Sequence, residues 1–171
     1  MVLIANKLIN KTIFLDTAPI IYYIEDHPKF RIKLNELFEL NATGKIHFQS
    51  SVLSLLEVLI LPIRKKRFDI AELYQQILSN SDNFELFEIT PEIAIKSAEL
   101  RARYNLKTPD AIQIATAIIK KADHFLTNDN ELKKITEINI LTPNQVICVF
   151  CRFPVGVGFK IIPEQGRNLS L

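Results

Sequence analysis

The sequence predicts an α/β fold in which helices cover both faces of a central, mostly parallel sheet. Short apolar runs that read as strands alternate along the chain with longer stretches of helical periodicity. The first such run, residues 12–15, is continuously apolar after its threonine, as expected of a central parallel strand that is buried on both faces. No internal repeat, low-complexity segment or long linker interrupts the alternation.

The elements follow one another in a regular order. The expected strands cover residues 12–15, 45–49, 84–89, 124–127 and 138–141. The expected helices cover residues 17–24, 29–40, 52–64, 70–78, 91–104, 109–121 and 130–134. Pro62 is expected to end or kink the third of these helices, because proline lacks the backbone N–H that a helix interior needs.

Hydroxyl side chains mark several of the helix starts. Thr17, Thr90 and Thr108 each stand one or two residues before a proline, and each is expected to cap the helix that follows. Ser50 or Ser51 is expected to cap the helix at 52–64.

The bulk properties are those of one globular domain. A chain of 171 residues can bury a substantial core, and we place the domain at 1–147 with a C-terminal extension of uncertain structure at 148–171. The formal net charge of +2 is too small to indicate a nucleic-acid partner by itself.

The N-terminal region lacks the features of a targeting segment. Asn6, Lys7 and Asn10 interrupt the apolar run that a signal peptide needs. The most apolar stretch, 52–61, is too short to span a bilayer and contains Glu57. We therefore expect a cytoplasmic protein with no membrane partner.

The two cysteines, Cys148 and Cys151, have the spacing C-x-x-C. A zinc site needs two more ligands, and no histidine lies nearby in the sequence. The favoured interpretation is a pair of small buried thiols in the apolar run at 146–153.

Four carboxylates are expected at one edge of the sheet. Asp16 and Asp129 follow strands, Asp110 lies in the first turn of a helix, and Glu57 lies in the helix that follows the second strand. Capping of a helix or turn is an ordinary explanation for the three aspartates. Glu57 has no such explanation, because its neighbours are leucine and valine and an unpaired carboxylate is costly to bury. A cluster of carboxylates suits Mg²⁺ or Mn²⁺, which can activate water and stabilise charge on a phosphate.

Four short motifs in this order resemble those of PIN-domain ribonucleases, of the kind found as VapC-type toxins. They are Phe-Leu-Asp-Thr at 14–17, Ser-Leu-Leu-Glu-Val at 54–58, Thr-Pro-Asp-Ala-Ile-Gln-Ile-Ala at 108–115 and Leu-Thr-Asn-Asp at 126–129. The resemblance implies a three-layer α/β/α fold and Mg²⁺- or Mn²⁺-dependent hydrolysis of RNA. It also implies that Asp16, Glu57, Asp110 and Asp129 are the catalytic, metal-binding acids and that Thr127 is a polar neighbour. Thr17 matches the first motif, and a role as a helix cap explains it equally well.

Partners follow from charge and from the resemblance. Arg64, Lys65, Lys66 and Arg67 form the densest positive run, which suits either a solvated helix end or contact with an RNA backbone. The resemblance implies an RNA substrate, a homodimer and an antitoxin that covers the site. The alternative is a catalytically silent PIN-like module that binds RNA or protein. A structure-specific DNA nuclease is a third possibility, disfavoured by the lack of a long arch-like insertion.

Overall fold

The computed structural model describes residues 3–147, and its centre is a five-stranded sheet in the order β4-β3-β2-β5-β6. Every neighbouring pair in this sheet is parallel. The predicted parallel sheet is therefore confirmed. Its strands are β2 (Thr12–Leu15), β3 (His47–Ser51), β4 (Phe84–Phe87), β5 (His124–Leu126) and β6 (Asn139–Leu141).

Helices connect the strands in the order that the sequence predicts. The α-helices are α1 (Thr17–Ile24), α2 (Arg31–Ala42), α3 (Val52–Arg64), α4 (Phe68–Asn80), α5 (Pro91–Tyr104) and α6 (Thr108–Ile119). Short 3-10 helices are η1 (Ala5–Leu8), η2 (Asn130–Lys134) and η3 (Pro143–Gln145).

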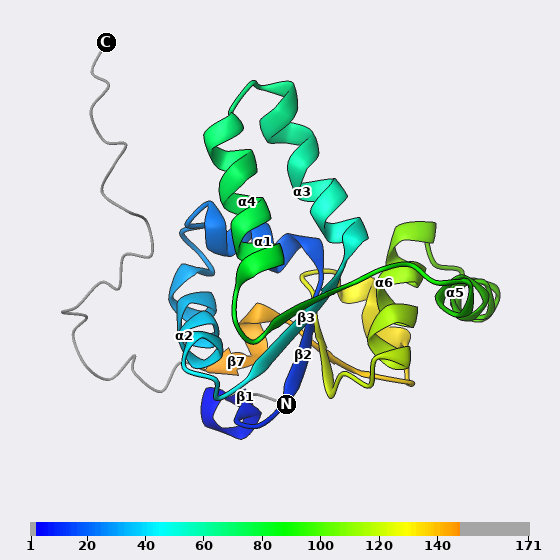
Figure 1. The fold of residues 1–171 in the computed structure, drawn as a ribbon. Coiled ribbons are helices and arrows are strands. Elements are labelled where there is room, and N and C mark those ends of the chain that lie inside the picture. Colours follow the sequence, from blue (N-terminus) through cyan, green and yellow to red (C-terminus); the bar gives the residue numbers. More distant parts are fainter. Residues whose placement is uncertain (1–2, 148–171) are drawn as a thin grey trace, which may run out of the picture.

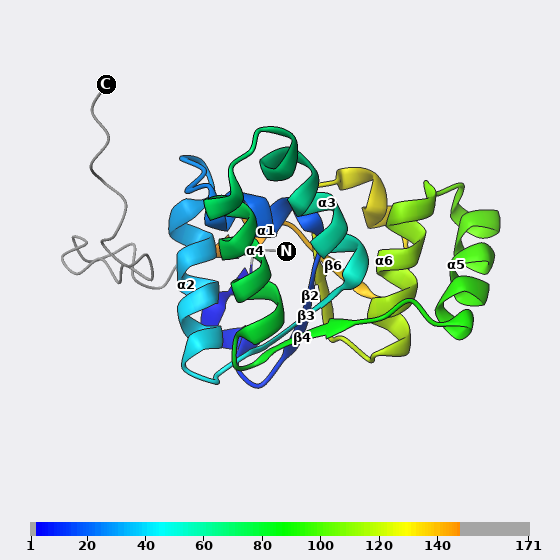
Figure 2. The ribbon, with the colours of Figure 1, turned by 45° about the horizontal axis from the view of Figure 1, so that its top comes forward.

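The sheet separates two hydrophobic cores, which confirms the three-layer α/β/α arrangement. In Figure 2, α1, α2 and α4 lie on one side of the strands and α5 and α6 on the other. Alternation along β2 serves both cores: Ile13 and Leu15 pack in the core with α1, α2 and α4, whereas Phe14 packs against α6. All three side chains are fully buried, as predicted for a central strand.

A helical hairpin made of α3 and α4 projects from the sheet, with its turn at the far end (Figure 1). The α3 helix spans Val52–Arg64, which confirms its predicted range, and Pro62 lies inside the helix and does not end it. The turn closes with hydrogen bonds from the N–H of Lys66 to the carbonyl of Ile63 and from the N–H of Arg67 to that of Pro62. This is the Schellman arrangement, and Lys66 takes the positive φ of 56° that it requires.

Two of the expected helix caps differ in the structure, at α1 and α6. Asp16, and not Thr17, is the N-cap of α1, and its carboxylate accepts the N–H of Thr17 at 2.7 Å. The N-cap of α6 is Lys107, because Thr108 is already helical. Ser51 is the N-cap of α3, as one of the two predicted candidates, but its side chain makes no cap hydrogen bond. The cap at Thr90 is confirmed, since its side chain accepts the N–H of Ile93.

The structure adds a small feature that the sequence did not predict. Strands β1 (Leu3–Ile4) and β7 (Val146–Ile147) pair in parallel and bring the two ends of the described chain together. The predicted extension at 148–171 and its two cysteines lie outside the described residues. Between residues 3 and 147, no helix has the length and apolar character needed to cross a membrane.

Candidate active site

Asp16 stands directly beyond the carboxyl end of β2, and its carboxylate is held on both oxygens. The backbone N–H of Thr17 donates to Oδ1, and the hydroxyl of Thr127 donates to Oδ2 at 2.6 Å. Thr127 is fully buried and follows β5, the strand next to β2. The same hydroxyl accepts the backbone N–H of Asp129 at 3.0 Å. Thr127 therefore joins the segments that carry Asp16 and Asp129.

Glu57 reaches the same region from α3. The hydroxyl of Thr17 donates to Glu57 Oε2 in a short hydrogen bond. Thr17 is therefore a direct neighbour of two of the predicted acids, and its side chain does not serve as the helix cap. A carboxylate in an otherwise apolar helix is thus satisfied by a polar contact from α1, as expected for a partly buried acid.

Asp110 and Asp129 complete the group from the other side. Asp110 lies in the first turn of α6, and Asp129 is exposed at the N-cap of η2, where its carboxylate accepts the N–H of Glu131 at 2.8 Å. Burial raises the pKa of the Asp110 carboxyl, and the charges of Asp129 and Glu57 raise it further, although Lys107 opposes them. The electrostatic coupling places these acids in one neighbourhood.

Asp16 experiences the same repulsion. Burial is the main reason that its pKa is raised, and the charges of Asp110 and Glu57 add to the effect, against the hydrogen bonds from Thr127 and Thr17. The fold therefore brings four acids from four segments to one edge of the sheet, where each added negative charge makes the next more costly.

Few positively charged side chains compensate the charge of the four acids. None of the ion pairs found within residues 3–147 involves Asp16, Glu57, Asp110 or Asp129. In the same part of the chain, no three His, Cys, Asp or Glu side chains already lie close enough together to hold a metal ion. All the donor atoms on offer are oxygens, the donor type that Mg²⁺ and Mn²⁺ prefer, so the residue chemistry fits such an ion.

A buried polar chain behind the acids was missed in the sequence. Ser50 donates to Ser54 at 2.8 Å, Ser54 donates to Gln113 Oε1 at 3.1 Å, and Gln113 Nε2 donates to the Thr17 hydroxyl at 3.0 Å. Ser50 and Ser54 are fully buried, and Gln113 is 2% exposed. The signal that could have identified Ser54 and Gln113 is the one that identified Glu57, a polar residue at a core position of an apolar helix, whereas Ser50 lies in β3.

The predicted basic cluster lies at the tip of the α3–α4 hairpin. Arg64, Lys65, Lys66 and Arg67 are all exposed, and Arg67 forms an ion pair with Asp69 at 2.8 Å. Since a helix rises about 1.5 Å per residue, Arg64 stands about 10 Å further along α3 than Glu57. The cluster is therefore beside the acidic edge and not part of it.

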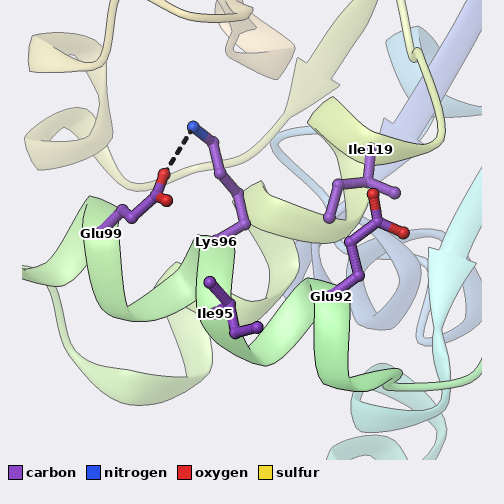
Figure 3. Close-up of a pocket in the computed structure, with 5 residues that line it drawn as sticks. All are labelled: Glu92, Ile95, Lys96, Glu99 and Ile119. Atoms are coloured by element: carbon purple, nitrogen blue, oxygen red, sulfur yellow. Dashed lines mark hydrogen bonds and ion pairs between the residues drawn. The ribbon is translucent and has the colours of Figure 1, made fainter.

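An open groove between α5 and α6 is a separate feature (Figure 3). It is lined by Glu92, Ile95, Lys96 and Glu99 of α5 and by Ile119 at the end of α6. Lys96, the positively charged side chain of the groove, is already paired, because its Nζ lies 3.0 Å from Glu99 Oε2. Ile119 is about 14 Å along α6 from Asp110, so the groove does not contain the acids.

Fold and site together define an α/β protein with an acidic site at the carboxyl edge of a parallel sheet. The model of the PIN domain matches residues 13–138, and the chain belongs to the PIN-domain family. Members of this family are typically nucleases. No curated protein matches the sequence.

Several solved structures share the fold. VapBC2 from Rickettsia felis, bound to a DNA fragment from its promoter, has 19% identity and a TM-score of 0.63, over 77% of this chain and 98% of that chain. A toxin–antitoxin complex from Klebsiella pneumoniae has 24% identity and a TM-score of 0.56, over 76% and 96%. FitAcB from Neisseria gonorrhoeae has 15% identity and a TM-score of 0.59, over 77% and 97%. At these identities the likeness establishes the fold.

Proposed function

We propose that the protein is a divalent-metal-dependent endoribonuclease that hydrolyses RNA phosphodiester bonds. The observation that carries the proposal is the gathering of four acids at one sheet edge, where burial and, to a lesser degree, mutual repulsion raise the pKa of Asp16 and Asp110. A cation would relieve that repulsion, which gives the arrangement a use that helix capping does not explain.

Each residue has a defined role in this proposal. Asp16, Glu57, Asp110 and Asp129 would hold Mg²⁺ or Mn²⁺, which supplies Lewis-acid stabilisation of charge on the phosphate and activation of water. Thr127 orients Asp16 through its hydroxyl and holds the backbone of Asp129. Thr17 orients Glu57. Arg64, Lys65, Lys66 and Arg67 would contact the RNA backbone beside the site.

RNA cleavage by the wild-type chain and Asp16→Asn in Mg²⁺ tests the proposal. Loss of one acid should reduce cleavage by at least about 100-fold, on the scale of removing one charged group that stabilises a transition state. Asp123→Asn is the matched control, because Asp123 also accepts a backbone N–H but does so at the start of β2, at the opposite edge of the sheet. Equal cleavage by wild type and Asp16→Asn would contradict the proposal, and no cleavage by the wild type would favour a silent module that binds RNA or protein.

We further propose that the protein acts in the cytoplasm as a toxin paired with an antitoxin. The similarity of the fold to VapBC2 and to the Klebsiella pneumoniae toxin–antitoxin complex supports this partner. A small adjacent reading frame whose product suppresses RNA cleavage by the purified chain would support the pairing. An adjacent product that leaves cleavage unchanged would count against it.

We also propose that the chain forms a homodimer through α3. Leu56, Ile60 and Ile63 are 56%, 48% and 51% exposed and recur at the spacing of one helix face. A row of exposed apolar side chains is typical of a protein–protein contact.

A further inference from the structure

Among the described residues, only Gln113 has a side chain that contacts both Asp16 and Thr17, the residue that donates to Glu57. Its Nε2 lies 3.0 Å from the Thr17 hydroxyl and 3.5 Å from Asp16 Oδ1. Gln113 and Thr116 are the buried polar residues of α6, and the Gln113 amide contacts Thr17 of α1 and Ser54 of α3.

The orientation of this amide follows from its neighbours on both sides. Ser54 donates to Gln113 Oε1, so the oxygen end of the amide points to α3 and the NH₂ end points to the acids. The acid side gives the same orientation: the Glu57 carboxylate can only accept, so Thr17 donates to it and Gln113 must present its NH₂ group to the Thr17 oxygen. A flipped amide would set its carbonyl oxygen against the Asp16 carboxylate, two acceptors facing each other.

The direction of donation continues to Glu57. Because Gln113 donates to the oxygen of Thr17, the single hydroxyl proton of Thr17 is directed to Glu57. One glutamine therefore contacts Asp16 directly and Glu57 through Thr17, and these two carboxylates repel each other. A buried polar chain of this kind is rigid only while all its members are satisfied.

We propose that Gln113 is a positioning residue, which holds Asp16 directly and Glu57 through Thr17 in the arrangement that binds the divalent cation. The inference rests on the proposed function and deepens it. Gln113 would not bind the cation or the RNA itself. Groups that orient metal ligands in this way are generally worth about 10- to 100-fold in metal affinity or activity.

Gln113→Met tests the inference, since methionine keeps the length of the side chain and removes both hydrogen-bonding groups. Mn²⁺ affinity of the full chain, measured by calorimetry without RNA, should fall by about 10- to 100-fold. The kcat for RNA cleavage should fall with it, and KM for RNA should be unchanged because Gln113 is buried away from solvent.

Gln49→Met is the matched control. Gln49 is also a buried glutamine that faces α6, but its amide donates to the carbonyl of Lys120 and contacts no acid of the site. A purely structural role for Gln113 would lower the unfolding temperature in both variants and leave Mn²⁺ affinity and kcat equal to wild type. That result, or equal losses of affinity in both variants, would overturn the inference.

Ser54→Ala provides a second variant should Gln113→Met fail to fold. It removes only the hydroxyl that fixes the amide, so Mn²⁺ affinity should fall, by less than in Gln113→Met, and wild-type affinity in Ser54→Ala would overturn the inference. The proposed function fails separately, if the wild-type chain itself neither binds Mn²⁺ nor cleaves RNA.

Discussion

At the scale of single residues, the carboxyl of Asp110 is ionised at a cost to folding. Burial and the charges of Asp129 and Glu57 raise its pKa from the ordinary value of 3.8, and its carboxylate has no side-chain hydrogen bond within residues 3–147. The folded state therefore binds the proton more tightly than the unfolded state. Stability is then lost as pH rises from 3.8 through the raised pKa of the folded state.

Asp110→Asn should accordingly stabilise the metal-free protein at pH 7 and make little difference at pH 3. The gain should be below about 1 kcal/mol, because Asp110 is only partly buried and solvent screens its charge. Urea unfolding in a chelator at the two pH values measures it. When Mn²⁺ is added, the wild type should become more stable than Asp110→Asn, since a bound ion stabilises only the chain that can hold it.

Asp123→Asn should change the stability of the protein in the opposite direction. Although burial acts to raise the pKa of Asp123, the hydrogen bonds from Lys11 and from the N–H of Thr12 lower it overall. Its stabilising effect is present above the ordinary pKa and is lost as pH falls through the lowered one. The variant should therefore be less stable than wild type at pH 7. A gain in stability at pH 7 would contradict this electrostatic assignment.

The acids of the site were predictable from the sequence because each has a recognisable place. Asp16, Asp110 and Asp129 stand at strand ends or helix starts, and Glu57 interrupts an apolar helix. The contacts that link them were not predictable. Whether Thr17 caps its own helix or bonds to Glu57 depends on how α1 and α3 pack, which no local pattern contains.

At the scale of elements, the turn between α3 and α4 contains one residue in an unfavourable backbone conformation. Lys66 has a φ of 56°, a conformation that glycine adopts without the clash that a Cβ introduces. Lys66→Gly should stabilise the protein by about 1 kcal/mol, which corresponds to about 2–4 °C in Tm for a chain of this size.

Lys65→Gly is the control for that prediction. Lys65 is the neighbouring cation and has a φ of −85°, where glycine offers no relief and adds flexibility to the unfolded chain. Thermal unfolding should rank Lys66→Gly above wild type and Lys65→Gly below it. The same shift in both variants would mean that charge, and not backbone conformation, controls the stability of the turn.

The hairpin tip also carries the proposed contacts to RNA. Replacing Arg64, Lys65 and Lys66 together by glutamine should weaken RNA binding and reduce its dependence on salt. Each lost contact to single-stranded RNA should lower the slope of log K against log salt by about 0.7, so three contacts account for about 2. Fluorescence anisotropy at several salt concentrations, in a chelator to prevent cleavage, measures the slope.

A matched triple variant controls for net charge. Lys7, Lys45 and Lys121 are exposed and precede β2, β3 and β5, which places them toward the opposite edge of the sheet. Their replacement by glutamine should leave most of the affinity and slope intact. If both triple variants lose the same amount of RNA affinity and of salt dependence, the tip has no specific role in binding RNA.

Element boundaries followed the sequence wherever a strong pattern existed. The runs at 12–15 and 124–127 gave strands at Thr12–Leu15 and His124–Leu126, because apolar residues bounded by polar ones allow one sensible alignment. The β1–β7 pair escaped prediction because two residues in each strand are too few to carry a period, and because their pairing joins positions far apart in the chain. Packing, and not local preference, forms that pair.

At the scale of the whole molecule, the exposed row on α3 predicts the assembly state. Ile60→Glu places a charge in the middle of the row and should convert a homodimer to a monomer in light scattering. The free energy of unfolding should fall by no more than about 0.5 kcal/mol, because the side chain is exposed. Ile32→Glu on α2 is the control, because Ile32 is similarly exposed at 50%. A wild-type monomer, or a dimer that survives Ile60→Glu, would contradict the proposed interface.

The central claim is that four acids from four segments form one divalent-cation site, and Mn²⁺ binding to the full chain tests it most directly. Calorimetric titration should give a clear affinity for the wild-type chain and a much weaker one for Asp16→Asn, Glu57→Gln, Asp110→Asn and Asp129→Asn. Asp123→Asn should bind as the wild type does, because Asp123 belongs to the opposite edge of the sheet. No binding by the wild type, or equal affinity in all the variants, would contradict the account.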